Sequence, residues 1–249
     1  MTQHNRLQGR RCGARPSTAH FVVPGGRRGG LSTASSPLCL YVGNYTSEVN
    51  PMNRTISLIG AAIVCTTVCL FAVCLIVDFS FGSYFVCTLL PMGYIMMAAG
   101  LHREAEEDRK VAANVGLLFS AIYATLILLV YFAQITSVRL DGLGEEALRV
   151  LDFKHGGLLF NYDLLGYAMM ALSTFFLGLS MQVKSRADRW LKRLLMLHGV
   201  FFVSCFIMPM TGMFRSMANG ENSNGGVIAL VIWCAYFLPV GVLAYRHFR

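Results

Sequence analysis

Residues 56–77 read ISLIGAAIVCTTVCLFAVCLIV, a stretch without a single charged side chain. An α-helix rises ~1.5 Å per residue, so a stretch of this length covers the ~30 Å hydrocarbon core of a bilayer. Inside lipid the backbone N–H and C=O groups must pair within the protein, which leaves helices and closed barrels as spanning structures. Because the apolar residues run continuously and do not alternate with polar ones, this stretch predicts a transmembrane helix.

Five further apolar stretches follow the first one. The expected spans lie at about residues 56–77, 84–101, 111–133, 158–181, 194–213 and 226–245. They predict an all-α, polytopic integral membrane protein, a six-transmembrane-helix bundle over residues 52–249. The composition agrees, since 55% of the residues are hydrophobic and 14% are charged, against ~25% charged in an ordinary soluble domain.

Residues 1–51 differ from the rest of the chain. They are rich in Gly, Arg and Ser, include the run GGRRGG at 25–30, and lack an apolar period. We therefore expect a disordered basic tail. Three interpretations stay open: a transit peptide of the mitochondrial type, a basic arm with a regulatory or lipid-binding role, or a translated extension upstream of a natural start at Met52. We favour the third, because Met52-Asn53-Arg54 followed directly by an apolar helix is a common start of bacterial inner-membrane proteins.

Basic residues gather at the ends of the apolar stretches. From Arg54 onward, eleven Lys and Arg residues flank one side of the expected bundle and four flank the other. Loops rich in Lys and Arg stay in the cytoplasm, so both termini are expected there, in a plasma membrane of bacterial type. The net charge of +8 could suggest a nucleic-acid partner, but basic residues at the ends of apolar stretches indicate helix anchoring. We therefore expect the lipid bilayer, and no nucleic acid, as the partner. Association into a homo-oligomer or with other membrane subunits is left open.

Ionisable side chains inside a membrane are costly and mark candidate functional sites. Asp163 lies in the first turns of the fourth span, with Gln134 and Arg215 at a similar depth. It is either a hydrated or salt-bridged interfacial carboxylate, or a cation or proton site reached from outside. His198 is expected close to the inner surface, ~15–20 Å from Asp163 along the membrane normal. We interpret it as a packing histidine bonded to a backbone carbonyl or to Asn114, with a functional role as the alternative.

Proline interrupts three of the expected spans, at Pro91, Pro209 and Pro239. Proline removes a helical hydrogen bond and kinks the helix, and broken helices often form the binding sites of transporters. The loop at residues 134–157 has apolar residues at helical spacing. It predicts a short amphipathic helix that either packs on the bundle at the membrane surface or covers an outward-facing cavity.

Enzyme signatures are absent from the sequence: it has no HExxH, GxxxxGK[ST] or GxSxG motif. Eight cysteines form no CxxC pair, and thiols within apolar helices behave as small hydrophobes. The charged stretch at residues 102–110 mixes both signs, which is typical of a solvated connector. We expect no enzymatic activity, no cofactor and no metal site. The sequence favours a small-molecule or ion permease, or a membrane subunit of one; a non-catalytic membrane scaffold or accessory protein is the alternative.

Overall fold

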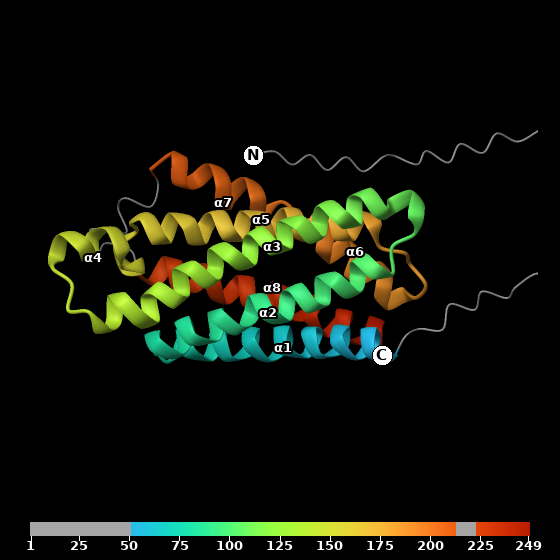
Figure 1. The fold of residues 1–249 in the computed structure, drawn as a ribbon, viewed down its shortest axis with the longest axis horizontal. Helices are drawn as coiled ribbons and strands as arrows, with labels where there is room; N and C mark the ends of the chain where they lie inside the picture. Colours follow the sequence, from blue (N-terminus) through green and yellow to red (C-terminus); the bar gives the residue numbers. More distant parts are fainter. Residues whose placement is uncertain (1–50, 213–222) are drawn as a thin grey trace, which may run out of the picture. The chain divides into compact units, whose positions relative to one another are not determined.

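The computed structural model describes residues 51–212 and 223–249 (Figure 1). The expected basic tail lies outside these residues, apart from Pro51, and so does Arg215. Within the described part the chain is helical and contains no strand. The long helices are α1 (Pro51–Ile76), α2 (Ser80–Arg103), α3 (Lys110–Ala133), α5 (Leu158–Ser180), α6 (Arg186–His198), α7 (Phe201–Met210) and α8 (Ser223–Phe248).

Six helical stretches of the described chain are long and apolar enough to cross a membrane. They are Pro51–Ile76, Ser80–Arg103, Glu107–Val138, Leu158–Ser180, Arg186–Met210 and Gly226–Phe248. The all-α class and the six candidate spans expected from hydropathy are thereby confirmed, and they are compatible with a multi-pass membrane protein. Such helices can be predicted from one apolar segment at a time, because in lipid every backbone polar group must bond within its own helix.

The helices pack into a closed ring. Neighbours in the ring are α1 and α2, α2 and α3, α3 and α5, α5 and α6, α6 and α8, and α8 and α1, while α7 contacts α5 (Figure 1). Large side chains such as Tyr94, Tyr123 and Phe237 fill the centre and are completely buried. Glycine permits the closest approach: a Cβ on Gly60 of α1 would lie 2.6 Å from the backbone nitrogen of Met97 on α2. Small residues at such contacts are typical of helices that pack within membranes.

The bundle has two distinct ends, which we name after the helices they carry. The α4 end carries the short helix α4 (Glu145–Leu151), the π-helical turn η2 (Gln134–Val138) and the 3₁₀ turn η3 (Phe153–His155). The α6 end carries the first turns of α6, the end of α8 and the short turn η1 (Glu107–Arg109). A helix therefore does occur in the loop at residues 134–157, whereas its role as a surface helix or lid stays a prediction.

The fifth span differs most from expectation. Its helical part begins at Arg186 and not near residue 194, because Ser185 and Asp188 form a capping box. The Ser185 hydroxyl accepts from the Asp188 N–H at 3.1 Å, and the Asp188 carboxylate accepts from the Ser185 N–H at 2.8 Å. Such a box satisfies backbone donors that the first turn leaves free. The charged first turns of α6 are amphipathic, and for that reason a search for continuous apolar sequence misses them.

Two residues, Gly199 and Val200, divide this span into α6 and α7. A Cβ on Gly199 would lie 2.9 Å from the Cβ of Phe175, so glycine allows the break to rest against α5. The Tyr236 hydroxyl of α8 donates to the carbonyl of Leu194 at 2.6 Å. The three prolines, Pro91, Pro209 and Pro239, lie inside α2, α7 and α8. The helices α2 and α8 continue well past their prolines, whereas α7 ends at Met210, directly after Pro209. The bends that the prolines produce stay a prediction.

Candidate functional site

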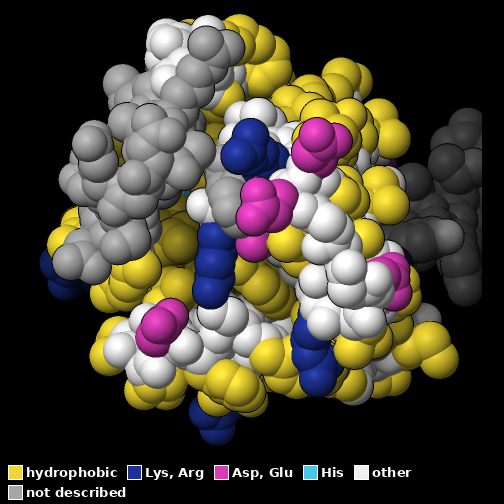
Figure 2. Space-filling model, turned by 90° about the vertical axis from the view of Figure 1, so that its left-hand side faces the viewer, with side chains coloured by type: hydrophobic (Ala, Val, Ile, Leu, Met, Phe, Trp, Pro, Cys, Tyr) yellow, Lys and Arg dark blue, Asp and Glu magenta, His cyan; other side chains and the backbone are white. Residues whose placement is uncertain are grey.

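A cavity of about 200 Å³ lies at the α4 end, and we call it the loop-end cavity. Its wall comes from the first turns of α2, from η2 with the adjoining Arg139, and from the segment around η3. Acidic and basic side chains stand close together among apolar ones on this end of the molecule (Figure 2). The π-helical turn is noteworthy, because single π turns within helices occur frequently at functional sites.

Gln134 holds one side of this cavity in place. Its side chain is buried, and its Nε2 donates to the carbonyl of Leu151 at 2.7 Å, while its Oε1 accepts from the N–H of Phe153 at 3.2 Å. The two bonds bracket Asp152, which lines the cavity. The sequence suggested Gln134 as a neighbour of Asp163 at the same depth, but its amide is bonded to the loop. Gln134 thus fixes the wall that carries Asp152.

Asp163 lies on α5, where it is 3% exposed. Its Oδ1 has no hydrogen-bond partner, and the Tyr131 hydroxyl is a hydrogen-bond partner of the carboxylate. Tyr131 in turn contacts Tyr84, which lines the loop-end cavity, with ring centroids 5.8 Å apart. Among the described residues, no Lys, Arg or His forms an ion pair with Asp163. A buried carboxylate without a counter-ion is stable only when it binds a proton or a cation.

Two further hydroxyl groups are buried beside Asp163 without a hydrogen-bond partner, those of Tyr123 and Tyr167. Helical spacing brings these groups together: Tyr123 and Tyr131 share a face of α3, and Asp163 and Tyr167 are one turn apart on α5. The rings of Tyr123 and Tyr167 are 5.9 Å apart, and the buried Cys87 thiol of α2 lies beside Tyr131 and Tyr167.

We call Cys87, Tyr123, Tyr131, Asp163 and Tyr167 the tyrosine–aspartate cluster. Buried polar groups in proteins bond to the protein, to ordered water or to ions. Three such atoms without a protein partner occur together here, between α2, α3 and α5. The arrangement is therefore suited to receive a proton, a water molecule or a small cation. Hydropathy indicated Asp163, whereas the tyrosines look like ordinary apolar residues in the sequence.

His198 is fully bonded. The Thr174 hydroxyl donates to the carbonyl of Ala171 at 2.9 Å, so it accepts from the Nδ1 of His198, also at 2.9 Å. The Trp233 indole donates to Nε2 of His198 at 3.1 Å. The imidazole is therefore neutral, and it joins α5, α6 and α8 at the break in the fifth span.

The sequence expectation for the partner of His198 was wrong. Its partners are Thr174 and Trp233, whereas Asn114 pairs with His102. The capped first turns of α6 lengthen the helix before His198, and the depth of His198 in the membrane stays a prediction. A packing role fits these contacts, and a functional role has no support from them.

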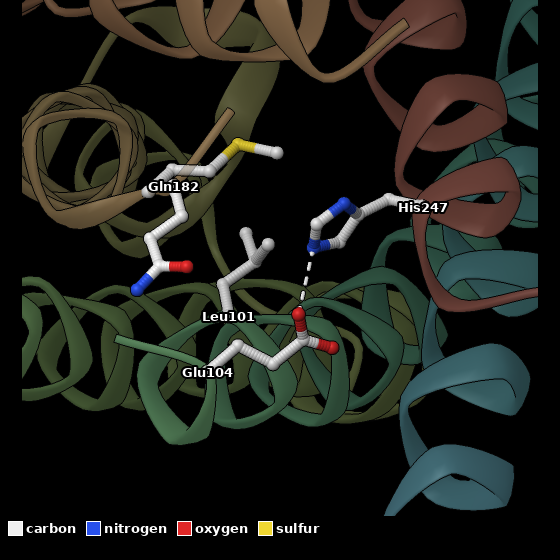
Figure 3. Close-up of a pocket in the computed structure, with 5 residues that line it drawn as sticks. Leu101, Glu104, Gln182 and His247 are labelled. Atoms are coloured by element: carbon white, nitrogen blue, oxygen red, sulfur yellow. Dashed lines mark ion pairs between the residues drawn. The ribbon is translucent and has the colours of Figure 1, made fainter. Parts of the chain in front are cut away.

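A second polar cluster ties the α6 end together. His247 of α8 bonds Asp188 of α6 through Nδ1 at 2.7 Å. Its Nε2 bonds Glu104, at the end of α2, at 3.2 Å (Figure 3). Lys184 adds an ion pair to Glu104 at 3.4 Å. The side chains of His247 and Asp188 are buried, at 5% and 6% exposure. An imidazole donates to carboxylates on both nitrogens only when it is protonated, so we call this trio the imidazolium clamp.

The clamp leaves little room for a ligand. The adjacent space, lined also by Leu101 and Gln182, measures about 10 Å³, near the minimum for one water molecule. The hydrogen bond from His247 lowers the pKa of Glu104 below its usual range, although partial burial opposes that shift. Residues 102–110 were expected to be a solvated connector, and Glu104 departs from that prediction. No local spacing could have indicated the clamp, because its three members lie far apart in the sequence.

Metal ligation and likeness to known proteins add no further site. In residues 51–212 and 223–249, no group of three or more His, Cys, Asp and Glu side chains is arranged to hold a metal ion. Comparison of the chain with protein-family models, with curated proteins and with solved structures found no match. A function must therefore be inferred from the residues of this chain.

Proposed function

We propose that this protein is a plasma-membrane permease, or the membrane subunit of one, in which Asp163 binds a proton or a small cation that enters through the loop-end cavity. The observation that carries the proposal is the buried Asp163 carboxylate, which has one oxygen without a hydrogen-bond partner. Intramembrane carboxylates of this kind mark ion and proton pathways in transporters. The contact between the Tyr84 and Tyr131 rings joins the cavity wall to the hydrogen-bond partner of Asp163, which supports entry from this side.

The surroundings of the cluster support this function. Tyrosine hydroxyls can donate to a carboxylate and also accept or coordinate through oxygen, so they suit either a proton or a hard cation. The broken fifth span supports it too, since discontinuous helices allow one part of a transporter to move against another. Under this proposal α7, which packs on α5, moves, whereas α6 stays with the imidazolium clamp.

Ion movement through Asp163 can be measured in proteoliposomes. A potassium diffusion potential, negative inside, is applied with valinomycin while trapped dyes report internal pH or sodium. We expect ion entry with the unchanged protein and background rates with Asp163→Asn. The matched control is Asp78→Asn, because Asp78 is exposed and has a positive φ of 53°, which asparagine tolerates well. Equal rates for Asp163→Asn and the unchanged protein would falsify the proposal.

A subunit of a larger permease would bind the ion without moving it, so binding needs its own measurement. A hydrophobic carbodiimide adds to a protonated carboxyl group in apolar surroundings, which peptide mass spectrometry detects. We expect modification of Asp163 in the detergent-purified protein, suppressed at high pH or, for a cation site, by Na⁺. An unmodified Asp163, together with absent ion entry, favours the alternative of a membrane scaffold. That alternative draws its support from the close helix contacts and from the clamp.

The distribution of Lys and Arg supports one orientation of the loop-end cavity in the membrane. The α6 end carries most of the basic flanks, so the proposal has this end and both termini in the cytoplasm and the loop-end cavity outside. A green fluorescent protein joined after Arg249 is expected to fluoresce, because it matures in the cytoplasm. Activity of a periplasmic alkaline phosphatase joined at the same position would contradict this orientation.

A further inference from the structure

The outward face of α6 combines basic, aromatic and apolar residues in one line. Residues three or four apart share a face of a helix, which aligns Arg186, Arg189, Trp190, Arg193 and Leu197. Val200 follows in the break between α6 and α7. All six are exposed, with Trp190 at 53%, Leu197 at 56% and Val200 at 63%. The guanidinium of Arg193 lies over the Trp190 ring, 5.5 Å from its centroid. The opposite face, with Leu191 and Leu195, is buried in the bundle.

This face is held in a fixed orientation. The capping box fixes the first turn of α6, and His247 holds Asp188 from α8. Lys192, beside the face, donates to the carbonyl of Met181 at 3.1 Å, so its charge points back to the protein. In contrast, none of the guanidinium groups of Arg186, Arg189 and Arg193 has an ion-pair partner within the part of the chain that the structure describes. Their positive charge is directed outward.

We propose that this face of α6 binds the phosphate headgroup of an anionic phospholipid. The guanidinium groups contact the phosphate, because planar guanidinium matches phosphate oxygens in pairs. Trp190 lies at the level of the glycerol backbone, where tryptophan is enriched in membrane proteins. Leu197 lies about two turns beyond Trp190, and it continues with Val200 beside the acyl chains. Along the helix, basic residues are followed by apolar ones, in the same order as the headgroup and the acyl chains of a lipid. This lipid site is independent of Asp163.

Trp190 provides a native probe for this site. The chain has two tryptophans, and the other, Trp233, is 7% exposed. The full chain is placed in phosphatidylcholine vesicles that contain either phosphatidylglycerol or phosphatidylcholine with brominated chains, since bromine quenches tryptophan on contact. The Trp190→Phe variant gives the signal of Trp233 for subtraction. We expect phosphatidylglycerol to be preferred about fivefold at Trp190, the factor typical of one basic contact near a membrane surface.

Charge removal separates a specific site from general attraction. In the double variant Arg189→Gln with Arg193→Gln, only Arg186 of the three guanidinium groups stays, and the preference is expected to fall well below fivefold. The control Arg246→Gln removes a charge from an exposed residue of α8 at the same end and should keep the preference. Equal quenching by both brominated lipids in the unchanged protein overturns the proposal, and so does an equal loss in the control. The single variant Arg189→Gln, with an intermediate preference, serves if the double variant does not fold.

Discussion

At the α6 end, two carboxylates share one imidazole, whereas nearer the α4 end the Asp163 carboxylate has no cation beside it among the described residues. The imidazolium clamp satisfies its charges within the protein and leaves space for no more than a water molecule. The tyrosine–aspartate cluster keeps three polar atoms without protein partners, and its Tyr131 contacts Tyr84 in the wall of the loop-end cavity. Fully bonded polar groups hold a fold in one arrangement, while incompletely bonded ones are available for a ligand. The contrast separates the carboxylates that hold the helices together from the one to which the proposed function assigns ion binding.

The same substitution at the two sites gives the largest expected difference. Asp188→Asn removes a charge that accepts from His247 and from two backbone N–H groups. We expect the free energy of unfolding to fall by about 3 kcal/mol, as when one partner of a buried ion pair is removed. Asp163→Asn removes a charge that has no counter-ion, so the free energy of unfolding should stay equal or rise. Denaturant titration of both variants in detergent measures the difference. An equal decrease of the free energy of unfolding in both would contradict the proposed difference between the two carboxylates.

Hydroxyl removal tests the cluster at a smaller scale. Tyr94 donates to the Ser173 hydroxyl at 2.9 Å, whereas the hydroxyls of Tyr123 and Tyr167 have no partner. Tyr94→Phe should lower the free energy of unfolding by about 1 kcal/mol, and Tyr123→Phe and Tyr167→Phe should raise it by up to about 1 kcal/mol. The three variants are matched in size, so thermal unfolding in one detergent compares them directly. Destabilisation by all three would mean that the hydroxyls of the cluster are bonded.

Protonation of Glu104 at low pH should weaken the imidazolium clamp and lower the stability of the protein. This is the smallest effect of the series. Because the hydrogen bond from His247 lowers its pKa, Glu104 stabilises the fold above the ordinary glutamate pKa of ~4.3. That contribution is lost as pH falls through the lowered pKa of the folded state. The melting temperature should therefore decrease as the pH is lowered beyond about 4.3. The decrease should be less steep in Glu104→Gln than in the unchanged protein, and equally steep in Glu107→Gln. The side chain of Glu104 is 38% exposed, so solvent screening keeps the effect small.

Hydropathy predicted the six spans because apolar length is a property of each segment alone. Asp163 was found for the same reason, since an acid within an apolar stretch stands out locally. The neighbours of Asp163 could not be predicted in this way, because depth along a helix does not say which face a residue occupies. Gln134 was expected at a similar depth, but its side chain bonds the loop. The clamp escaped prediction because tertiary packing, and not local spacing, joins Glu104, Asp188 and His247. Arg215 lies outside the described residues, and its pairing with Asp163 stays a prediction.

Under the proposed function, Gln134 would couple the loop-end cavity to Asp163. It lies one turn beyond Tyr131 on a continuous helical stretch, and its amide bonds the backbone on both sides of Asp152. A solute that pushes the Asp152 segment outward would pull on this amide and rotate the last turn of α3. That rotation would move the Tyr131 hydroxyl relative to Asp163. The Gln134 side chain would thus couple the binding of a solute in the loop-end cavity to the affinity of Asp163 for its ion.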